Sequence, residues 1–202
     1  MKLYYSPGAC SLSPHIVLCE AGLDFTIEKV NLRTKETESG RDFSAINPKG
    51  YVPALELDGG EVLTEGPAIV QYVADLVPEK KLVPPAGTLA RTRVQEWLNF
   101  IGTELHKNFT PLFNPASTDD IRNAAQANIA RRLPIAATAL DAHPYLIGDS
   151  FSVADAYLFT VLSWTGFVKV DITPWPSLAA FVERMKARPG VQAALAAEGL
   201  DR

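Results

Sequence analysis

KLYYSPGACSLSPHIVLCEAG, residues 2–22, is the stretch that decides the fold of this chain. Its apolar start, Leu3 to Tyr5, predicts a β-strand, and the Ser6-Pro7-Gly8 segment ends that strand. Residues 12–21 carry apolar side chains at helical spacing, and a glycine follows them, as is usual after a helix. The stretch therefore predicts a strand, a turn and a helix, with Cys10 at the start of the helix.

Cys10 is the candidate chemical group of this stretch. The start of a helix offers open N–H groups and a positive dipole end, which favour the thiolate and can lower a cysteine pKa below its free value of about 8.5. Cys10 to Ser13 is a C-x-x-S pattern, a one-thiol relative of the C-x-x-C redox motif without the resolving thiol. Such a cysteine suits attack on an external thiol compound. Cys19, on the apolar helix face, is expected to be a small buried hydrophobe.

The composition is that of a globular protein with one large or two small domains. The chain has 202 residues, of which 47% are hydrophobic and 21% charged. A net charge of -4 argues against nucleic acid as the main partner. We expect neither a secretory signal nor a membrane span, because no long apolar run is present. Two cysteines nine positions apart do not suggest a disulfide framework, so the sequence predicts a cytoplasmic location.

A second strand is predicted over residues 25–30, where apolar and polar side chains alternate. A strand, a helix and a strand within about thirty residues predict a right-handed unit with parallel strands. Residues 31–50 are polar and irregular, with a short helix expected near 42–46. Lys35 lies in this loop, where a lysine is usually a solvated charge.

Pro53 stands at the entry of a β-hairpin predicted over residues 54–63, where it cannot donate to the ladder. A cis Val52–Pro53 bond would turn the Val52 backbone N–H and C=O away from the sheet, toward a ligand. A helix is predicted directly after the hairpin. The N–H groups around Glu65 and Gly66, at its start, predict an anion site suited to a carboxylate.

The Pro- and Lys-rich segment 79–87 is predicted to link an N-terminal domain, residues 1–78, to an all-helical domain, residues 88–202. Pro134 is expected to kink or split one of the long helices. Ser152 and Asp155 are predicted to cap the buried central helix as structural residues. The helices predicted in this domain are, in chain order, 88–109, 118–143, 156–167, 176–187 and 191–197.

Four polar residues of the first of these helices, Asn99, Thr103, His106 and Lys107, recur at helical spacings of three and four. They predict a polar face turned toward a cleft or a neighbouring subunit. A lone helical histidine is more often solvated than functional, but these neighbours favour a role for His106. No metal site is expected, because the three histidines show no ligand spacing.

The order of the predicted elements and two motifs carry a family resemblance. The order of predicted elements, with Cys10 at the first helix and Val-Pro before the third strand, resembles the thioredoxin-like domain. Glu-Gly-Pro-Ala-Ile at 65–69 resembles the (Glu/Gln)-Ser-x-Ala-Ile segment of glutathione transferases. Paired aromatics followed by Pro-Gly-Ala-Cys-Ser, at residues 4–11, resemble the opening of the bacterial beta class. The resemblance covers the whole chain and implies an α/β thioredoxin-like domain followed by an all-α domain.

This resemblance implies an enzyme that conjugates glutathione, its co-substrate, to small hydrophobic electrophiles in detoxification, working as a homodimer without a metal. Cys10 and His106 would lie at the glutathione thiol. The implied glutathione-binding residues are Val52 and Pro53 for the cysteinyl part, Glu65 and Gly66 for the γ-glutamyl end, Lys35 and Lys107 for the glycyl carboxylate, and Asn99 and Thr103 from the partner subunit. The electrophile would lie near Tyr5, Ala9, Phe109, Phe113 and Trp164.

One departure and two alternatives remain. Gly66 stands where the family commonly has serine, so a hydroxyl contact is lost while the backbone N–H is kept. The first alternative is a thiol-disulfide reductase or reductive dehalogenase in which Cys10 cycles through a glutathione mixed disulfide. The second is a non-catalytic binding or regulatory protein, since fold does not fix function. The presence of Cys10 and of a polar face at His106 argues against the second.

Overall fold

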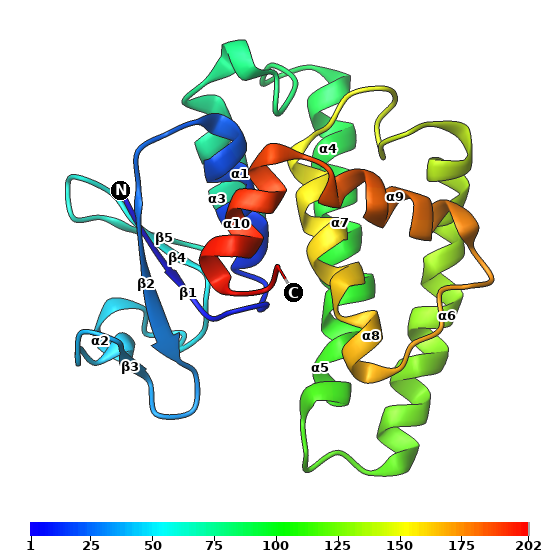
Figure 1. Cartoon of the computed structure of the whole chain (residues 1–202), viewed down its shortest axis with the longest axis horizontal. Helices are drawn as coiled ribbons and strands as arrows, with labels where there is room; N and C mark the ends of the chain where they lie inside the picture. The colour runs from blue at the N-terminus through cyan, green and yellow to red at the C-terminus, as the bar shows by residue number, and fades with distance from the viewer. Residues whose placement is uncertain (202) are drawn as a thin grey trace. The chain divides into compact units, whose positions relative to one another are not determined.

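The computed structural model describes residues 1–201, which form two compact units (Figure 1). The first unit comprises Met1–Leu82 together with the segment that begins at Ala187, and the second is Val83–Lys186. Sequence reasoning placed all of residues 88–202 in one helical domain. The structure differs in that the last helix belongs with the first unit.

The first unit is built on a five-stranded sheet with the strand order β3-β2-β1-β4-β5. β1 pairs with β2 in parallel, and the other neighbours are antiparallel, so the predicted parallel unit and hairpin are both confirmed. β3 was not predicted, because a strand of two residues has no readable alternation. The strands are β1 (Lys2–Tyr5), β2 (Thr26–Asn31), β3 (Glu36–Thr37), β4 (Ala54–Glu56) and β5 (Val62–Thr64).

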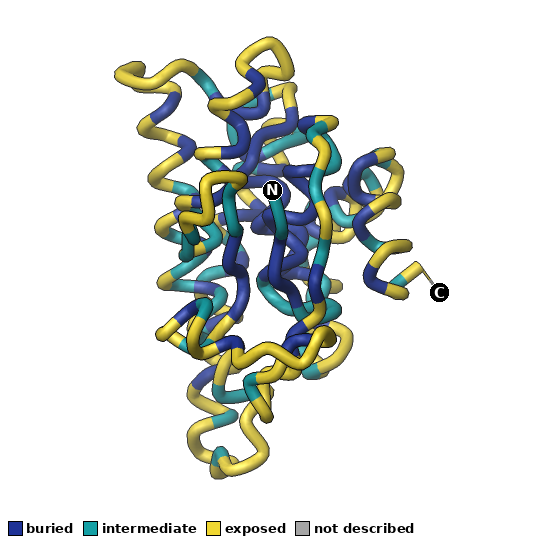
Figure 2. The backbone as a smooth tube through the Cα atoms, turned by 90° about the vertical axis from the view of Figure 1, so that its left-hand side faces the viewer, coloured by how far each residue is buried: buried dark blue, intermediate teal, exposed yellow. Residues whose placement is uncertain are grey.

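Central strand β1 is buried on both faces of the sheet (Figure 2). Side chains alternate along a strand, so Leu3 and Tyr5 face one side and Tyr4 the other. Tyr4 packs with Phe43 of the short helix α2 in a cluster that includes Val52. The helices of this unit are α1 (Leu12–Ala21), α2 (Phe43–Ile46), α3 (Gly66–Asp75), η1 (Pro78–Lys80) and α10 (Pro189–Glu198).

α10 packs against α1 (Figure 1). Arg188 donates two hydrogen bonds, of 2.9 and 2.7 Å, to the carboxylate of Glu20 in α1. Gly190 allows the close approach, because a Cβ there would lie 2.6 Å from the Glu20 Cγ. The Arg188–Glu20 ion pair holds α10 against α1, and the absence of a side chain at Gly190 lets the two helices approach closely. Neither feature leaves a periodic signal in the sequence.

The second unit is all helical. The helix predicted over 88–109 is one continuous run whose middle, η2, is a π-helix with i→i+5 hydrogen bonds. α6 runs through Pro134 as one helix, so of the two expected effects of Pro134, a kink or a split, the split does not occur. The helices are α4 (Leu89–Phe100), η2 (Ile101–His106), α5 (Lys107–Phe113), α6 (Asp119–Ala142), α7 (Val153–Ser163), α8 (Thr165–Val168) and α9 (Pro176–Lys186).

α7 is the buried centre of this unit and contacts α4, η2 and α9. The predicted cap is confirmed: the Asp155 carboxylate accepts from the backbone N–H of Leu146 and from both N–H and hydroxyl of Ser152, at 2.8 to 2.9 Å. Burial raises the pKa of Asp155 to about 6. The central helix was predicted to reach residue 167, but α7 ends at Ser163, and Phe167 in α8 is 75% exposed.

Among residues 1–201, no helix is long and apolar enough to cross a membrane. Over the same residues, no cluster of three histidine, cysteine, aspartate or glutamate side chains could hold a metal ion.

Candidate functional site

Cys10 lies in the turn between β1 and α1, as predicted. Its Sγ donates to the backbone carbonyl of Val52 at 3.1 Å. The turn is tight: the N–H of Leu12 donates to the Ala9 carbonyl at 2.9 Å, and that of Ser13 to the Cys10 carbonyl at 3.3 Å. The expectation of open N–H groups at the helix start is therefore only partly right, because local turn bonds take two of them.

The loop before Pro53 connects the other predicted residues of this unit. The carbonyl of Gly50 accepts from Lys35 Nζ at 2.6 Å. Lys49 Nζ and Tyr51 Oη both donate to Glu65 Oε1, at 2.6 and 2.8 Å. The next residue of the loop is Val52, whose carbonyl accepts from the Cys10 thiol. The structure therefore brings the predicted residues of this unit together around the loop that precedes Pro53.

Asn47 fixes this loop, and sequence reasoning missed it. Its side chain is buried, with Nδ2 donating to the Tyr51 carbonyl at 2.7 Å and Oδ1 accepting from the Lys49 N–H at 3.1 Å. Its own carbonyl accepts from the Gly50 N–H at 2.8 Å. The Asn-Pro-Lys-Gly pattern does indicate a turn. It does not indicate that the asparagine side chain is buried and fixes the loop through hydrogen bonds to its backbone.

Glu65 and Gly66 begin α3. Glu65 has φ of 70°, a left-handed conformation, and its carbonyl accepts from the N–H groups of Ala68 and Ile69. Gly66 lies against Pro53: a Cβ built on it would be 3.7 Å from Pro53 Cγ, an ordinary contact. The Val52–Pro53 peptide is cis, as the sequence suggested. The predicted anion site is thus a helix start beside the cis-proline.

Glu198, at the end of α10, is a second residue that sequence reasoning missed. Its carboxylate is fully buried, with Oε2 accepting from the Gly8 N–H at 2.8 Å and Oε1 bonded to His15 Nδ1 at 2.8 Å. The buried pair ties the turn that carries Cys10 to the last helix. A glutamate beside alanines near the end of a sequence is usually solvated, so no local pattern indicates this contact.

In the second unit, His106 is the last residue of η2 and lies among aromatic rings. Its Nδ1 is 2.6 Å from Tyr157 Oη, and its ring centroid is 4.8 Å from that of Trp164. Trp164 also packs edge-on against Phe109 and Phe113. Burial lowers the pKa of His106 to about 4, so its imidazole is neutral at pH 7.

The four polar residues predicted on one face are divided. Asn99, Thr103 and Lys107 are exposed, and the Thr103 hydroxyl donates to the Asn99 carbonyl at 3.0 Å. His106 instead turns toward Tyr157. The reason is the π-helix, which places more residues in each turn than the α-helical spacing assumed.

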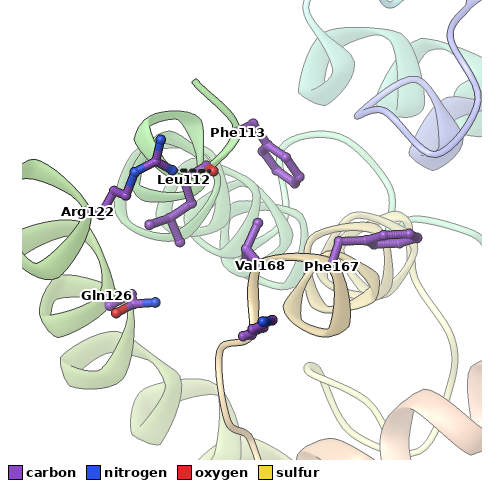
Figure 3. Close-up of a pocket in the computed structure, with 7 residues that line it drawn as sticks. Leu112, Phe113, Arg122, Gln126, Phe167 and Val168 are labelled. Atoms are coloured by element: carbon purple, nitrogen blue, oxygen red, sulfur yellow. Dashed lines mark hydrogen bonds between the residues drawn. The ribbon is translucent and has the colours of Figure 1, made fainter. Parts of the chain in front are cut away.

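A pocket of about 500 Å³ lies in the second unit, where α8 faces α5 and α6 (Figure 3). Of the residues expected near the electrophile, half-exposed Phe113 lines it, whereas Tyr5, Phe109 and Trp164 are buried side chains. Arg122 donates to the Leu112 carbonyl at 3.2 Å beside the pocket. The lining residues are Leu112, Phe113, Arg122, Gln126, Phe167, Val168 and Lys169.

Comparison with known proteins gives the family. Residues 8–76 match the model of the glutathione S-transferase N-terminal domain, and residues 100–189 that of its C-terminal domain. The chain is 50% identical to glutathione S-transferase GstA of Escherichia coli O157:H7, over 99% of this chain and 100% of that one. It superposes on a sphingomonad glutathione S-transferase complexed with glutathione and on the bacterial beta-class enzyme of Sphingomonas chungbukensis. Each is 48% identical with a TM-score of 0.96, covering 99% of this chain and 100% of the other. The chain therefore belongs to the glutathione S-transferase family and resembles its bacterial beta class.

Proposed function

We propose that this protein is a glutathione transferase that conjugates glutathione to small hydrophobic electrophiles. One observation carries the proposal: the Cys10 thiol lies 3.1 Å from the Val52 carbonyl, at a cis-proline loop beside a helix start. Relatives along the whole chain are named glutathione S-transferases, and one is complexed with glutathione.

In this proposal the first unit binds most of the tripeptide. The Val52 and Pro53 segment binds the cysteinyl part, while Glu65 and the Gly66 N–H bind the γ-glutamyl end. Lys35 neutralises the glycyl carboxylate. From the second unit, Lys107 also serves that carboxylate, and His106 contacts the sulfur.

The chemistry then needs little beyond activation and placement. Glutathione loses its thiol proton to water, and the resulting thiolate attacks the electrophilic carbon, forming the S–C bond while the leaving group departs with its electron pair. The protein accelerates this step by favouring the thiolate and by holding both reactants in position. The pocket beside Phe113 is the proposed place for the electrophile, because its walls are partly apolar.

Two parallel assays test this function. Wild-type protein is given glutathione with an aromatic chloride, and separately a glutathione mixed disulfide. We expect consumption of the chloride. Cys10→Ala should abolish any disulfide reduction and leave part of the conjugation, since Val52 and Glu65 still position the tripeptide. Consumption of the disulfide alone would replace this proposal with the reductase alternative.

We also propose a cytoplasmic homodimer. Cys10 and Cys19 are not joined in a disulfide, in keeping with a reducing compartment. Asn99 and Thr103 are exposed and adjacent, in keeping with a contact to the γ-glutamyl group bound by the partner subunit. Sedimentation at micromolar protein is expected to give the mass of a dimer. A monomer at that concentration would remove these two residues from the proposed glutathione site.

Gly66→Ser is expected to tighten glutathione binding. The added side chain fits, because its Cβ would meet only Pro53 Cγ at an ordinary 3.7 Å, and the hydroxyl would stand at the start of α3. One new hydrogen bond of about 1 kcal/mol lowers the KM for glutathione roughly fivefold. Gly59→Ser, in an open hairpin turn, is the matched control and should leave KM unchanged. Equal KM values for both variants would contradict the placement of the γ-glutamyl end.

Alkylation should distinguish the two cysteines. Burial, with the charges of Glu20 and Glu198, raises the pKa of Cys19 to about 11, so its thiolate is scarce at neutral pH. Cys10, at the start of α1, should react with iodoacetamide at least about tenfold faster. The rate at Cys19 should rise only as the pH approaches 11. Rates measured against pH for Cys10→Ala and Cys19→Ala decide this, and a fast Cys19 beside an inert Cys10 would overturn the site.

A further inference from the structure

Tyr157 is a buried tyrosine of α7 that has no role in the conjugation step described above. Its exposed fraction is 5%, and its hydroxyl lies 2.6 Å from His106 Nδ1, a short and direct hydrogen bond. The hydroxyl lies against the backbone of η2, since a Cβ at Gly102 would be 3.6 Å from it. The contact joins the central helix of the second unit to the one histidine proposed to meet the substrate.

The orientation of the imidazole is fixed by more than this bond. The Tyr157 ring meets it edge-on, at 86° with centroids 5.9 Å apart. The Trp164 ring packs on it at 4.8 Å and 62°. Since two aromatic rings restrict its rotation, the nitrogen that Tyr157 does not hold has a defined direction.

The proton of the hydrogen bond belongs on the tyrosine. A phenol is a stronger acid than a neutral imidazole N–H, and the unprotonated ring nitrogen is a stronger base than a phenol oxygen. The favoured bond is therefore Oη–H donating to the lone pair of Nδ1. In a neutral imidazole, the nitrogen that accepts leaves the ring proton on the other nitrogen, Nε2.

We propose that Tyr157 is a positioning residue that fixes His106 as an Nε2–H donor to the sulfur of bound glutathione. This inference rests on the proposed function. It gives His106 a specific part: the ring stabilises the thiolate with a hydrogen bond and does not accept the thiol proton, which passes to water. Tyr157 acts only through His106 and does not touch the substrate.

The charge state of the His106 imidazole agrees with its role as a hydrogen-bond donor. Burial, followed by the nearby Lys107, lowers the pKa of His106 to about 4, so the ring stays neutral from about pH 5 upward. A neutral ring keeps one proton, and the Tyr157 bond decides which nitrogen carries it. The donor is therefore present over the whole pH range in which glutathione ionises.

Nitrogen-15 NMR of histidine-labelled protein reads the tautomer directly. Three histidines are present, and His106→Gln assigns the signals of His106 by their loss. Wild type should show the Nε2–H pattern for His106, and Tyr157→Phe a mixture of both tautomers. Tyr72→Phe, on partly exposed α3, is the matched control and should match wild type. An Nδ1–H pattern in wild type, or no change in Tyr157→Phe, overturns the inference.

The second arm follows the thiol. Thiolate absorbance of bound glutathione against pH should show a raised thiol pKa in Tyr157→Phe. The conjugation rate at neutral pH should fall by less than about fivefold, because fivefold is the worth of the whole hydrogen bond and a mixture of tautomers keeps part of it. The deficit should vanish at alkaline pH, where the thiol is ionised anyway. A structural defect alone would lower the rate at every pH.

Substitution of the histidine gives the remaining control. His106→Gln keeps an N–H donor at nearly the reach of Nε2 and should retain more activity than His106→Asn, whose shorter amide matches Nδ1. A shifted tautomer without any change in the bound thiol pKa would overturn the donor role. A wild-type protein that binds glutathione but conjugates nothing would contradict the proposed function instead, and the tautomer result would stand.

Discussion

Glu198→Ala is expected to lower the free energy of unfolding by about 3–5 kcal/mol, because it removes one partner of a buried, hydrogen-bonded carboxylate–histidine pair. The change removes the carboxylate that His15, whose side chain is 2% exposed, is bonded to, and it removes the Glu198 oxygen that accepts from the Gly8 N–H. Urea denaturation measures the loss. Glutathione affinity should fall as well, since Gly8 lies two residues from Cys10.

Two further variants make this prediction sharp. Glu198→Gln keeps a side-chain acceptor of the same shape and should lose roughly half as much stability. Glu183→Ala removes a carboxylate that is 72% exposed on α9 and should change the free energy of unfolding by less than about 0.5 kcal/mol. Stability of Glu198→Ala within 1 kcal/mol of wild type would show that the pair does not hold the turn.

Asn47→Ala is expected to abolish most glutathione binding. The buried side chain makes two hydrogen bonds to the loop backbone, and their loss leaves the Tyr51 carbonyl and the Lys49 N–H without these partners. Each such group costs about 1–3 kcal/mol if it stays buried. The loop carries the contacts to Cys10, Lys35 and Glu65, so affinity should fall at least tenfold in calorimetric titration.

Asn31→Ala is the matched control for that loss. Its Oδ1 also accepts two backbone N–H groups, from Arg33 and Thr34, but in an exposed turn where water replaces it. We expect a small loss of stability and normal glutathione affinity. If Asn47→Ala bound glutathione as tightly as this control does, the loop would not be the template of the binding site.

Local patterns predicted the parts of the fold that are local. The apolar run before Cys10, the helical spacing after it and the hairpin turn each depend on neighbours in the sequence, and the elements formed where they were expected. Cys10, Val52 and Glu65 could be named as candidates for the same reason, since each stands beside a turn or a helix start. Their contacts to one loop follow from the βαβ order.

Apart from Asn47, the missed residues act across long separations. His15 and Glu198 are 183 positions apart, and His106 and Tyr157 are 51 apart. A buried partner at such a distance leaves no periodicity, so a glutamate in an alanine-rich helix and a tyrosine in an apolar helix resemble ordinary surface and core residues. The prediction that His106 shares a face with Thr103 was wrong for a different reason. Both residues lie in the six-residue π-helix η2, whose wider turns point the two side chains in different directions.

The packing of α10 against α1 affects the order in which parts of the first unit can fold during translation. The sheet, the Cys10 turn and the cis-proline loop all leave the ribosome early, yet the carboxylate that closes the turn arrives only after the whole second unit has been translated. Contacts of such separation form slowly, because the intervening chain must first be brought together. The helical unit is contiguous and free to fold during synthesis. The Cys10 turn is completed last, so a nascent chain carries Cys10 before it has the helix that closes this turn.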